Sequence, residues 1–196
     1  MTGSNAKDDL RHYLQQARDA LLWKLDDLSE YDARRPLTRT GTNLLGLVKH
    51  VASVELGYFG ETFGRPSGVP LPWFEPDAEL NADMWATPDE SRAEIIGLYH
   101  RAWAHSDATI DALALDAIGH VPHWPAERST VTLHRILIHL TAETHRHAGH
   151  ADIVRELIDG TVGMRAKQGN MAPGSWAWWS AYHDRLEHAA QEATGD

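Results

Sequence analysis

Side chains that commonly bind metals gather in one stretch of the sequence, from His139 to His150. At about 100° per residue, an α-helix through this stretch places His139, Glu143, His147 and His150 on one stripe about 80° wide. Apolar residues share that sector, so we expect the stripe to face the protein interior. A buried carboxylate among imidazoles is costly unless a partner satisfies it, and a divalent metal does so. Because Glu and His at positions i and i+4 converge above a helix, Glu143 and His147 are the predicted ligand pair.

A third ligand is expected from another helix, because two ligands from one helix rarely complete a metal site. His50 is the candidate, since Leu47 and Val54 lie on its side of a predicted helix and place it on the apolar face. Three nitrogen and oxygen ligands leave a fourth position open for water or substrate, which is typical of a catalytic metal site. His139 and His150 are then available to hydrogen-bond the ligands.

The same residues allow other interpretations. His147 and His150, at i and i+3, form an alternative ligand pair, with Glu143 acting as a base. His50 by itself is also typical of a hydrogen-bonded histidine in a protein core. Glu143 and His147 are equally compatible with an ordinary ion pair on a helix surface. A metal site and a polar cluster without metal are therefore both open at this point.

Long helices are needed to position these residues, and the apolar periodicity predicts four. Apolar positions at spacings of three and four residues predict helices over residues 7–31, 42–63, 87–115 and 129–159. The third begins at Thr87, where Pro88 and Glu90 complete a typical helix start. A connection rich in Pro and aromatic residues, 64–87, separates the second helix from the third. Ser175 caps a short last helix over about 175–190, and no strand is predicted.

These elements define one predicted architecture. The fold class is all-α: a four-helix bundle with a long crossover between the second and third helices, plus a short C-terminal helix. A length of 196 residues suits a single domain over 1–196, with its core at about 7–160. Aromatic residues such as Trp73, Trp85 and the C-terminal group of Trp176, Trp178 and Trp179 are candidate interface anchors, so we include a homodimer among the predictions.

Composition restricts the classes of function. The chain carries 18 Lys and Arg against 28 Asp and Glu, a net charge of −10. Nucleic acids and anionic membrane surfaces select basic faces, so we expect neither as a partner. The chain contains no Cys, which excludes disulfides, thiolate metal ligands and a Cys nucleophile. The polar N-terminus and the lack of an apolar run of about 20 residues predict a cytoplasmic protein without a membrane span.

The motifs around the predicted ligands resemble the DinB-like superfamily. The resemblance is closer to its actinobacterial branch, which is related to mycothiol-dependent maleylpyruvate isomerase and mycothiol S-transferases. It covers roughly residues 10–160 and rests on Val48-Lys49-His50-Val51-Ala52, on the run from Glu143 to Ile153, and on Arg155-Glu156-Leu157-Ile158-Asp159-Gly160. It implies a four-helix bundle with a long crossover, and a metal held by one His of the second helix and a pair on the fourth. Many members carry His-x3-His as that pair, whereas Glu143 and His147 are similar to the isomerase-like pattern.

The resemblance also implies cofactors and chemistry. It implies zinc as the metal, with nickel or iron as alternatives, and a low-molecular-weight thiol similar to mycothiol as cosubstrate. A metal can hold such a thiol as thiolate at neutral pH. The thiolate would attack an electrophilic small molecule, transferring sulfur or isomerising a double bond, with His139 or His150 taking the thiol proton. The alternatives are a metal-dependent hydrolase, a non-catalytic metal-binding bundle associated with stress, and a helical scaffold without metal.

Overall fold

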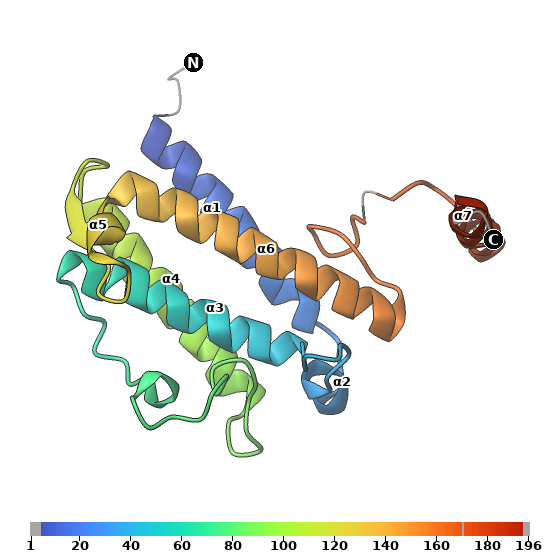
Figure 1. Ribbon diagram of the computed structural model, residues 1–196, viewed down its shortest axis with the longest axis horizontal. Helices are drawn as coiled ribbons and strands as arrows, with labels where there is room; N and C mark the ends of the chain where they lie inside the picture. The colour runs from blue at the N-terminus through green and yellow to red at the C-terminus, as the bar shows by residue number, and fades with distance from the viewer. Residues whose placement is uncertain (1–4, 170, 194–196) are drawn as a thin grey trace.

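The protein, described here by a computed structural model, is mostly helical and contains one small sheet (Figure 1). The structure describes residues 5–169 and 171–193. Five helices are long: α1 (Ala6–Leu22), α3 (Leu44–Phe59), α4 (Arg92–Ala112), α6 (Leu133–Asp159) and α7 (Trp176–Ala193). The shorter elements are η1 (Trp23–Leu25), α2 (Glu30–Arg34), η2 (Glu61–Phe63), η3 (Pro72–Phe74) and α5 (Ala126–Ser129). Strands β1 (Ile118–His120) and β2 (Thr130–Thr132) pair antiparallel, with Gly119 opposite Val131.

Helices α1, α3, α4 and α6 form the helical core of the molecule. Helix α3 packs against both α4 and α6, and α1 packs against α6 (Figure 1). Each of the four contributes to a shared apolar cluster through one of Leu14, Phe59, Ile110 and Leu137, which are all fully buried. Burial of such side chains is the main favourable term in folding, so this cluster fixes α3 beside α6. That contact brings His50 toward Glu143 and His147.

Side-chain caps set where the core helices begin. Asn43 accepts a hydrogen bond from the Gly46 amide at the start of α3, and Thr132 accepts one from the Arg135 amide at the start of α6. Helix α6 ends before Gly160, whose φ of 78° is left-handed and suits glycine. The predicted segment 129–159 is therefore helical only from Leu133, because its first residues pair in the sheet. The all-α prediction placed no strand in the sequence, and it misses these two three-residue strands.

The predicted start of the third helix at Thr87 is wrong. Helix α4 begins at Arg92, where Ser91 and Glu94 form a reciprocal capping box. The Thr87 amide instead donates to the carboxylate of Glu90 at 2.7 Å. Because Glu90 also forms an ion pair with buried Lys49, the residues before Ser91 serve to fasten the connection rather than to start a helix.

The predicted first helix, 7–31, is interrupted. Helix α1 ends at Leu22, and Asp27 has a left-handed φ of 58° before α2 begins. The guanidinium of Arg155, on α6, donates to the backbone carbonyls of Lys24 at 2.9 Å and Asp26 at 2.8 Å. A side chain from the far end of the sequence thus stabilises the turn. Helix α3 likewise ends at Phe59, and 3-10 helix η2 takes the place of the last predicted turn.

The connection between α3 and α4 lies against α3. Lys49 Nζ donates to the carbonyls of Ala82 at 2.9 Å and Trp85 at 3.0 Å. The approach is close enough that a Cβ added to Gly46 would lie 1.8 Å from the Met84 carbonyl oxygen. Trp73 is half-buried and packs on the core, where its Nε1 donates to Ser53 Oγ, and its role as an interface anchor stays a prediction.

Helix α7 stands apart from the helical core (Figure 1). None of its described side chains is buried, and Trp176 is 86 % exposed. The rings of Trp178 and Tyr182 stack on each other at 5.3 Å. The helix extends to Ala193, so it is longer than the short helix predicted over 175–190. No helix among the described residues is both long and apolar enough to span a membrane.

Candidate metal centre

Three side chains from two helices converge at one point. His50 on α3 and Glu143 and His147 on α6 each bring one ligand atom to within 4.8 Å of the other two. Glu143 Oε1 lies 2.9 Å from His147 Nε2 and 4.0 Å from His50 Nε2. Zinc binds such atoms at about 2.0–2.2 Å, so small side-chain adjustments bring all three within reach of a common ion. The three residues predicted as ligands, one on α3 and two on α6, therefore lie close together.

The chemistry of these side chains fits a divalent metal. His147 is almost fully buried, and among the described residues its Nδ1 has no hydrogen-bond partner. Burial lowers the pKa of the His147 imidazole, and the neighbouring His50 lowers it further. The ring is therefore neutral at neutral pH, which is the form that binds metal. Two imidazoles and one carboxylate are ligands that zinc, nickel and iron all accept.

Asp83 positions one of the candidate ligands, and the sequence analysis missed it. Its Oδ2 lies 2.6 Å from His50 Nδ1 and accepts the hydrogen bond from that nitrogen when it is protonated. This contact directs the other ring nitrogen, Nε2, toward Glu143. Asp83 lies in the connection between α3 and α4, which Lys49 holds against α3 through a hydrogen bond to the Ala82 carbonyl. Two adjacent residues of α3 therefore serve the site, since His50 is the candidate ligand and Lys49 holds the connection that carries Asp83. In the sequence, Asp83 is visible only as an acidic residue in a connection rich in aromatic residues, and this alone does not indicate a contact with His50.

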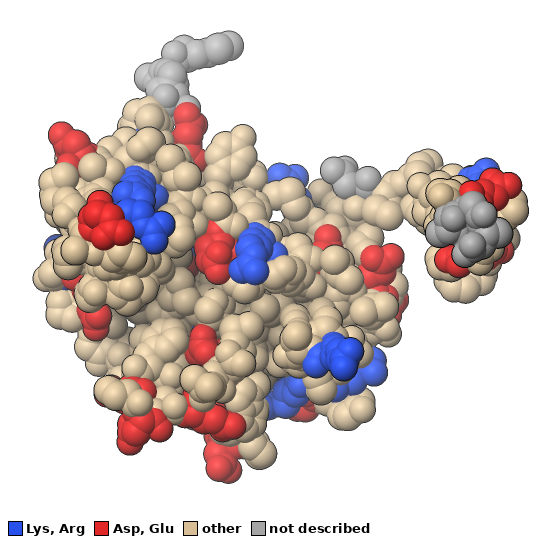
Figure 2. Space-filling view, viewed as in Figure 1, with Lys and Arg blue, Asp and Glu red and all other residues tan. Residues whose placement is uncertain are grey.

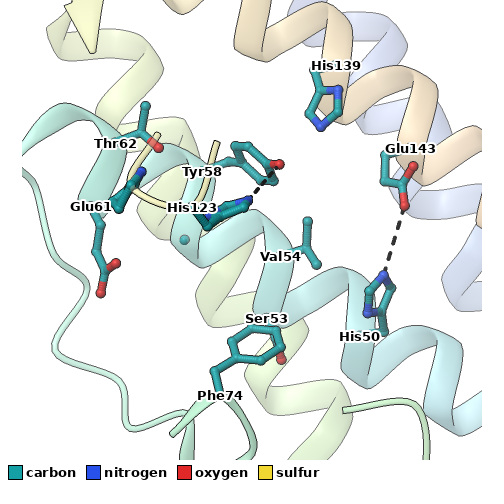
Figure 3. Close-up of a pocket in the computed structure, with 12 residues that line it drawn as sticks. His50, Ser53, Val54, Tyr58, Glu61, Thr62, Phe74, His123, His139 and Glu143 are labelled. Atoms are coloured by element: carbon teal, nitrogen blue, oxygen red, sulfur yellow. Dashed lines mark hydrogen bonds and ion pairs between the residues drawn. The ribbon is translucent and has the colours of Figure 1, made fainter. Parts of the chain in front are cut away.

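A cavity of about 680 Å³ opens beside the candidate ligands (Figure 3). His50 and Glu143 form part of its wall, and the remaining wall includes Ser53, Val54, Tyr58, Phe74, His123 and His139. Its volume is in the range of pockets that bind small molecules. The wall comes from α3, α6, η3 and the loop between β1 and α5, so one small molecule there can contact both core helices and two connections.

The two predicted catalytic histidines occupy different surroundings. His139 lines the cavity, and its ring packs edge-on against Tyr58 at 4.9 Å and Trp124 at 5.3 Å. Burial lowers the pKa of His139, so the ring is neutral and able to accept a proton. His150 packs against His147 with 5.4 Å between ring centroids and is not part of the cavity wall. The geometry thus favours His139 over His150 as the group that meets a substrate.

The sequence analysis also missed a set of hydrogen-bonded side chains at the cavity, formed by Tyr58, His123 and Trp124. Trp124 Nε1 donates a hydrogen bond to Tyr58 Oη at 2.9 Å, and His123 Nε2 lies 3.2 Å from the same oxygen. His123 and Trp124 belong to a loop, where no periodicity indicates which side chains face a cavity. Tyr58 lies within the predicted helix 42–63, where apolar periodicity indicates packing and gives no sign of a cavity.

The charged side chains of one face are scattered over a mostly uncharged surface (Figure 2). Figure 2 shows Asp and Glu spread over one face of the molecule, with Lys and Arg divided among small groups. On that face there is no broad basic area of the kind that nucleic acid selects.

Comparison with known proteins identifies a family to which the chain is similar. A family model described as "MST: Mycothiol-S-transferase" matches residues 9–160. No curated protein matches the chain. The matched range contains His50, Glu143 and His147 together with Asp83, and it leaves α7 outside.

Proposed function

The chain belongs to the mycothiol S-transferase family, within the DinB-like group that its motifs predicted, and from that premise we propose a specific reaction. The protein transfers the sulfur of mycothiol, or of a closely similar thiol, to an electrophilic small molecule in a metal-dependent reaction. The observation that carries this proposal is the convergence of His50, Glu143 and His147 at the wall of a cavity large enough for a small molecule. A chain without Cys must take its attacking sulfur from a cosubstrate.

Under this proposal His50, Glu143 and His147 hold a divalent metal, with zinc favoured and nickel or iron as alternatives. When bound, the metal lowers the pKa of the thiol so that sulfur is present as thiolate at neutral pH. Asp83 keeps His50 oriented for this role through its hydrogen bond to Nδ1.

His139 is the proposed acceptor of the thiol proton. Its ring lines the cavity and is neutral at neutral pH, because burial lowers its pKa. The S–H bond breaks, the proton moves to a ring nitrogen of His139, and the electron pair stays on sulfur. Sulfur then forms a bond to the electrophilic carbon, while a leaving group departs or a double bond takes up the electrons. His150, behind His147, is the alternative acceptor retained from the sequence.

The architecture that supports this site is also part of the proposal. We propose that α1, α3, α4 and α6 are the four-helix bundle predicted from the sequence, with the α3–α4 connection as its crossover. The contacts of α3 with α4 and α6, and of α1 with α6, support this arrangement. The exposed aromatic residues of α7 support the predicted homodimer, which remains a proposal.

The test is an assay of thiol transfer with metal-loaded protein. Purified protein is incubated with zinc, mycothiol and monochlorobimane, an electrophile that becomes fluorescent when a thiol displaces its chloride. We expect adduct formation above the uncatalysed rate only when both thiol and metal are present. His50→Ala should abolish this activity, whereas His100→Ala, at an exposed position on α4, should retain it.

Two results would contradict the proposal. Full activity in His50→Ala would exclude the ligand assignment. Conversion of test substrates without any thiol would indicate the metal-dependent hydrolase instead.

A further inference from the structure

Tyr58 lies in the cavity wall with its oxygen beside the His123 ring (Figure 3), and the same oxygen is within hydrogen-bond distance of Trp124. Trp124 Nε1 lies 2.9 Å from Tyr58 Oη, and because an indole nitrogen can only donate, the phenol oxygen accepts this bond. His123 Nε2 lies 3.2 Å from the same oxygen. When Nε2 carries a proton, both nitrogens donate to Oη, and the phenol O–H is free to point into the cavity.

This arrangement suits a group that gives up a proton. A phenolate left behind at Tyr58 keeps the hydrogen bonds from Trp124 and His123, and its negative charge strengthens both. His123 is exposed, so it exchanges protons with solvent and can restore the phenol. Burial raises the pKa of Tyr58, and the Glu143 carboxylate raises it further, so the phenol is protonated before the reaction.

The position of Tyr58 relative to the candidate ligands indicates what it would protonate. Tyr58 and His50 lie eight residues apart on α3, which corresponds to about 12 Å along the helix axis. Both line the same cavity, so a small electrophile can meet the thiol sulfur at one end and the phenol at the other. A conjugated ketone has this form, since its electrophilic carbon and its carbonyl oxygen are separated by the conjugated bonds.

We propose that Tyr58, supported by Trp124 and His123, donates a proton to the electrophile's oxygen as it gains negative charge. The inference rests on the proposed thiol transfer and adds a catalytic residue to it. With a conjugated ketone, the sulfur forms a bond to the β-carbon and the electrons of the double bond move toward the carbonyl oxygen. That oxygen takes the phenol proton, which gives an enol that tautomerises to the ketone. His123 or solvent then returns a proton to Tyr58.

The test compares two electrophiles that differ in their need for a proton. With mycothiol as thiol, 2-cyclohexenone needs protonation at oxygen, whereas monochlorobimane releases chloride and needs none. Tyr58→Phe should lower kcat/KM for the ketone by about 100-fold, a typical loss for a missing general acid, and should lower kcat/KM for monochlorobimane far less, so that the ratio of the two values falls. Tyr13→Phe, at an exposed tyrosine of α1, is the matched control and should change neither rate.

Equal losses with both electrophiles, or no loss with the ketone, would overturn the assignment of Tyr58. His123→Ala provides a second variant at an exposed loop position and should show a smaller loss that is again greater for the ketone than for monochlorobimane. If the unsubstituted protein transferred no thiol to either electrophile, the proposed function itself would be refuted. Activity with monochlorobimane but unchanged ketone kinetics in both variants would refute the role of Tyr58 alone.

Discussion

Asp83→Asn is expected to weaken metal binding while leaving the helical core intact. The carboxylate of Asp83 lies 2.6 Å from His50 Nδ1, and the two side chains are only 15 % and 18 % exposed. Asn keeps the size of the side chain but removes its charge, and its amide group can turn a donor toward the ring N–H. His50 then loses the partner that fixes its orientation and makes its other nitrogen a better ligand.

The size of this effect follows from the type of contact. A hydrogen bond to a charged group contributes about 1.5–3 kcal/mol, and about 1.4 kcal/mol corresponds to a tenfold change in affinity. Both side chains are largely shielded from solvent, so little of this contribution is lost to screening. We therefore expect the Kd for zinc to rise about 10- to 100-fold, in line with the usual effect of losing a residue that orients a metal ligand.

The assay is a zinc titration in competition with a chromogenic chelator, at neutral pH. Asp77→Asn is the matched control, because it makes the same replacement at an exposed position of the same connection. It should leave the Kd unchanged. A Kd for Asp83→Asn within twofold of the unsubstituted protein would refute the orienting role of Asp83. Circular dichroism of both variants would verify that the helices are retained.

Two further predictions concern stability. Because burial lowers the pKa of His139 and His147 below 6.5, the unfolded chain binds protons that the folded chain does not. The Tm of the metal-free protein should therefore be highest above pH 6.5 and fall as pH decreases below it; a Tm that rises on acidification would contradict the burial of neutral rings. Glu55→Ala should reduce the free energy of unfolding in urea by about 3 kcal/mol, since it removes the fully buried carboxylate that pairs with buried Arg18 and leaves that guanidinium its contact with the partly exposed Asp107. A loss below about 1 kcal/mol would exclude an essential role for this ion pair.

The candidate ligands were predictable because they depend on helical periodicity. His139, Glu143 and His147 share a stripe of α6 by spacing alone, and His50 lies on the same side of α3 as buried Leu47. Only the packing of α3 against α6, which the sequence does not state, was needed to bring them together. The site thus follows from two amphipathic helices, α3 and α6, that pack against each other.

The groups that support the ligands were not predictable in the same way. Asp83 and His123 lie in connections, and the positions of connections are determined by tertiary contacts such as the bonds of Lys49 to two backbone carbonyls. Periodicity gives no information about such contacts. Tyr58 was missed for a related reason. Its position among apolar residues of the helix predicts only that the ring packs, and does not indicate that the residue lines a cavity.

Errors in the element boundaries have similar causes. The break after α1 depends on Arg155, more than one hundred residues away in the sequence, and the sheet consists of strands too short to produce an alternating pattern. At α4 two start signals lie close together, and the one with a complete capping box prevails. That each segment is helical was nevertheless predictable, because apolar periodicity extends over many residues, whereas these effects change only where a helix begins or ends.

Crystals of the zinc-loaded protein, measured at the zinc absorption edge, would test the central claim directly. We predict one strong anomalous peak at about 2.0–2.2 Å from ligand atoms of His50, Glu143 and His147. The peak should disappear in crystals of His50→Ala prepared in the same way. An anomalous peak elsewhere, or none at these three side chains, would contradict the metal centre and the thiol chemistry proposed from it.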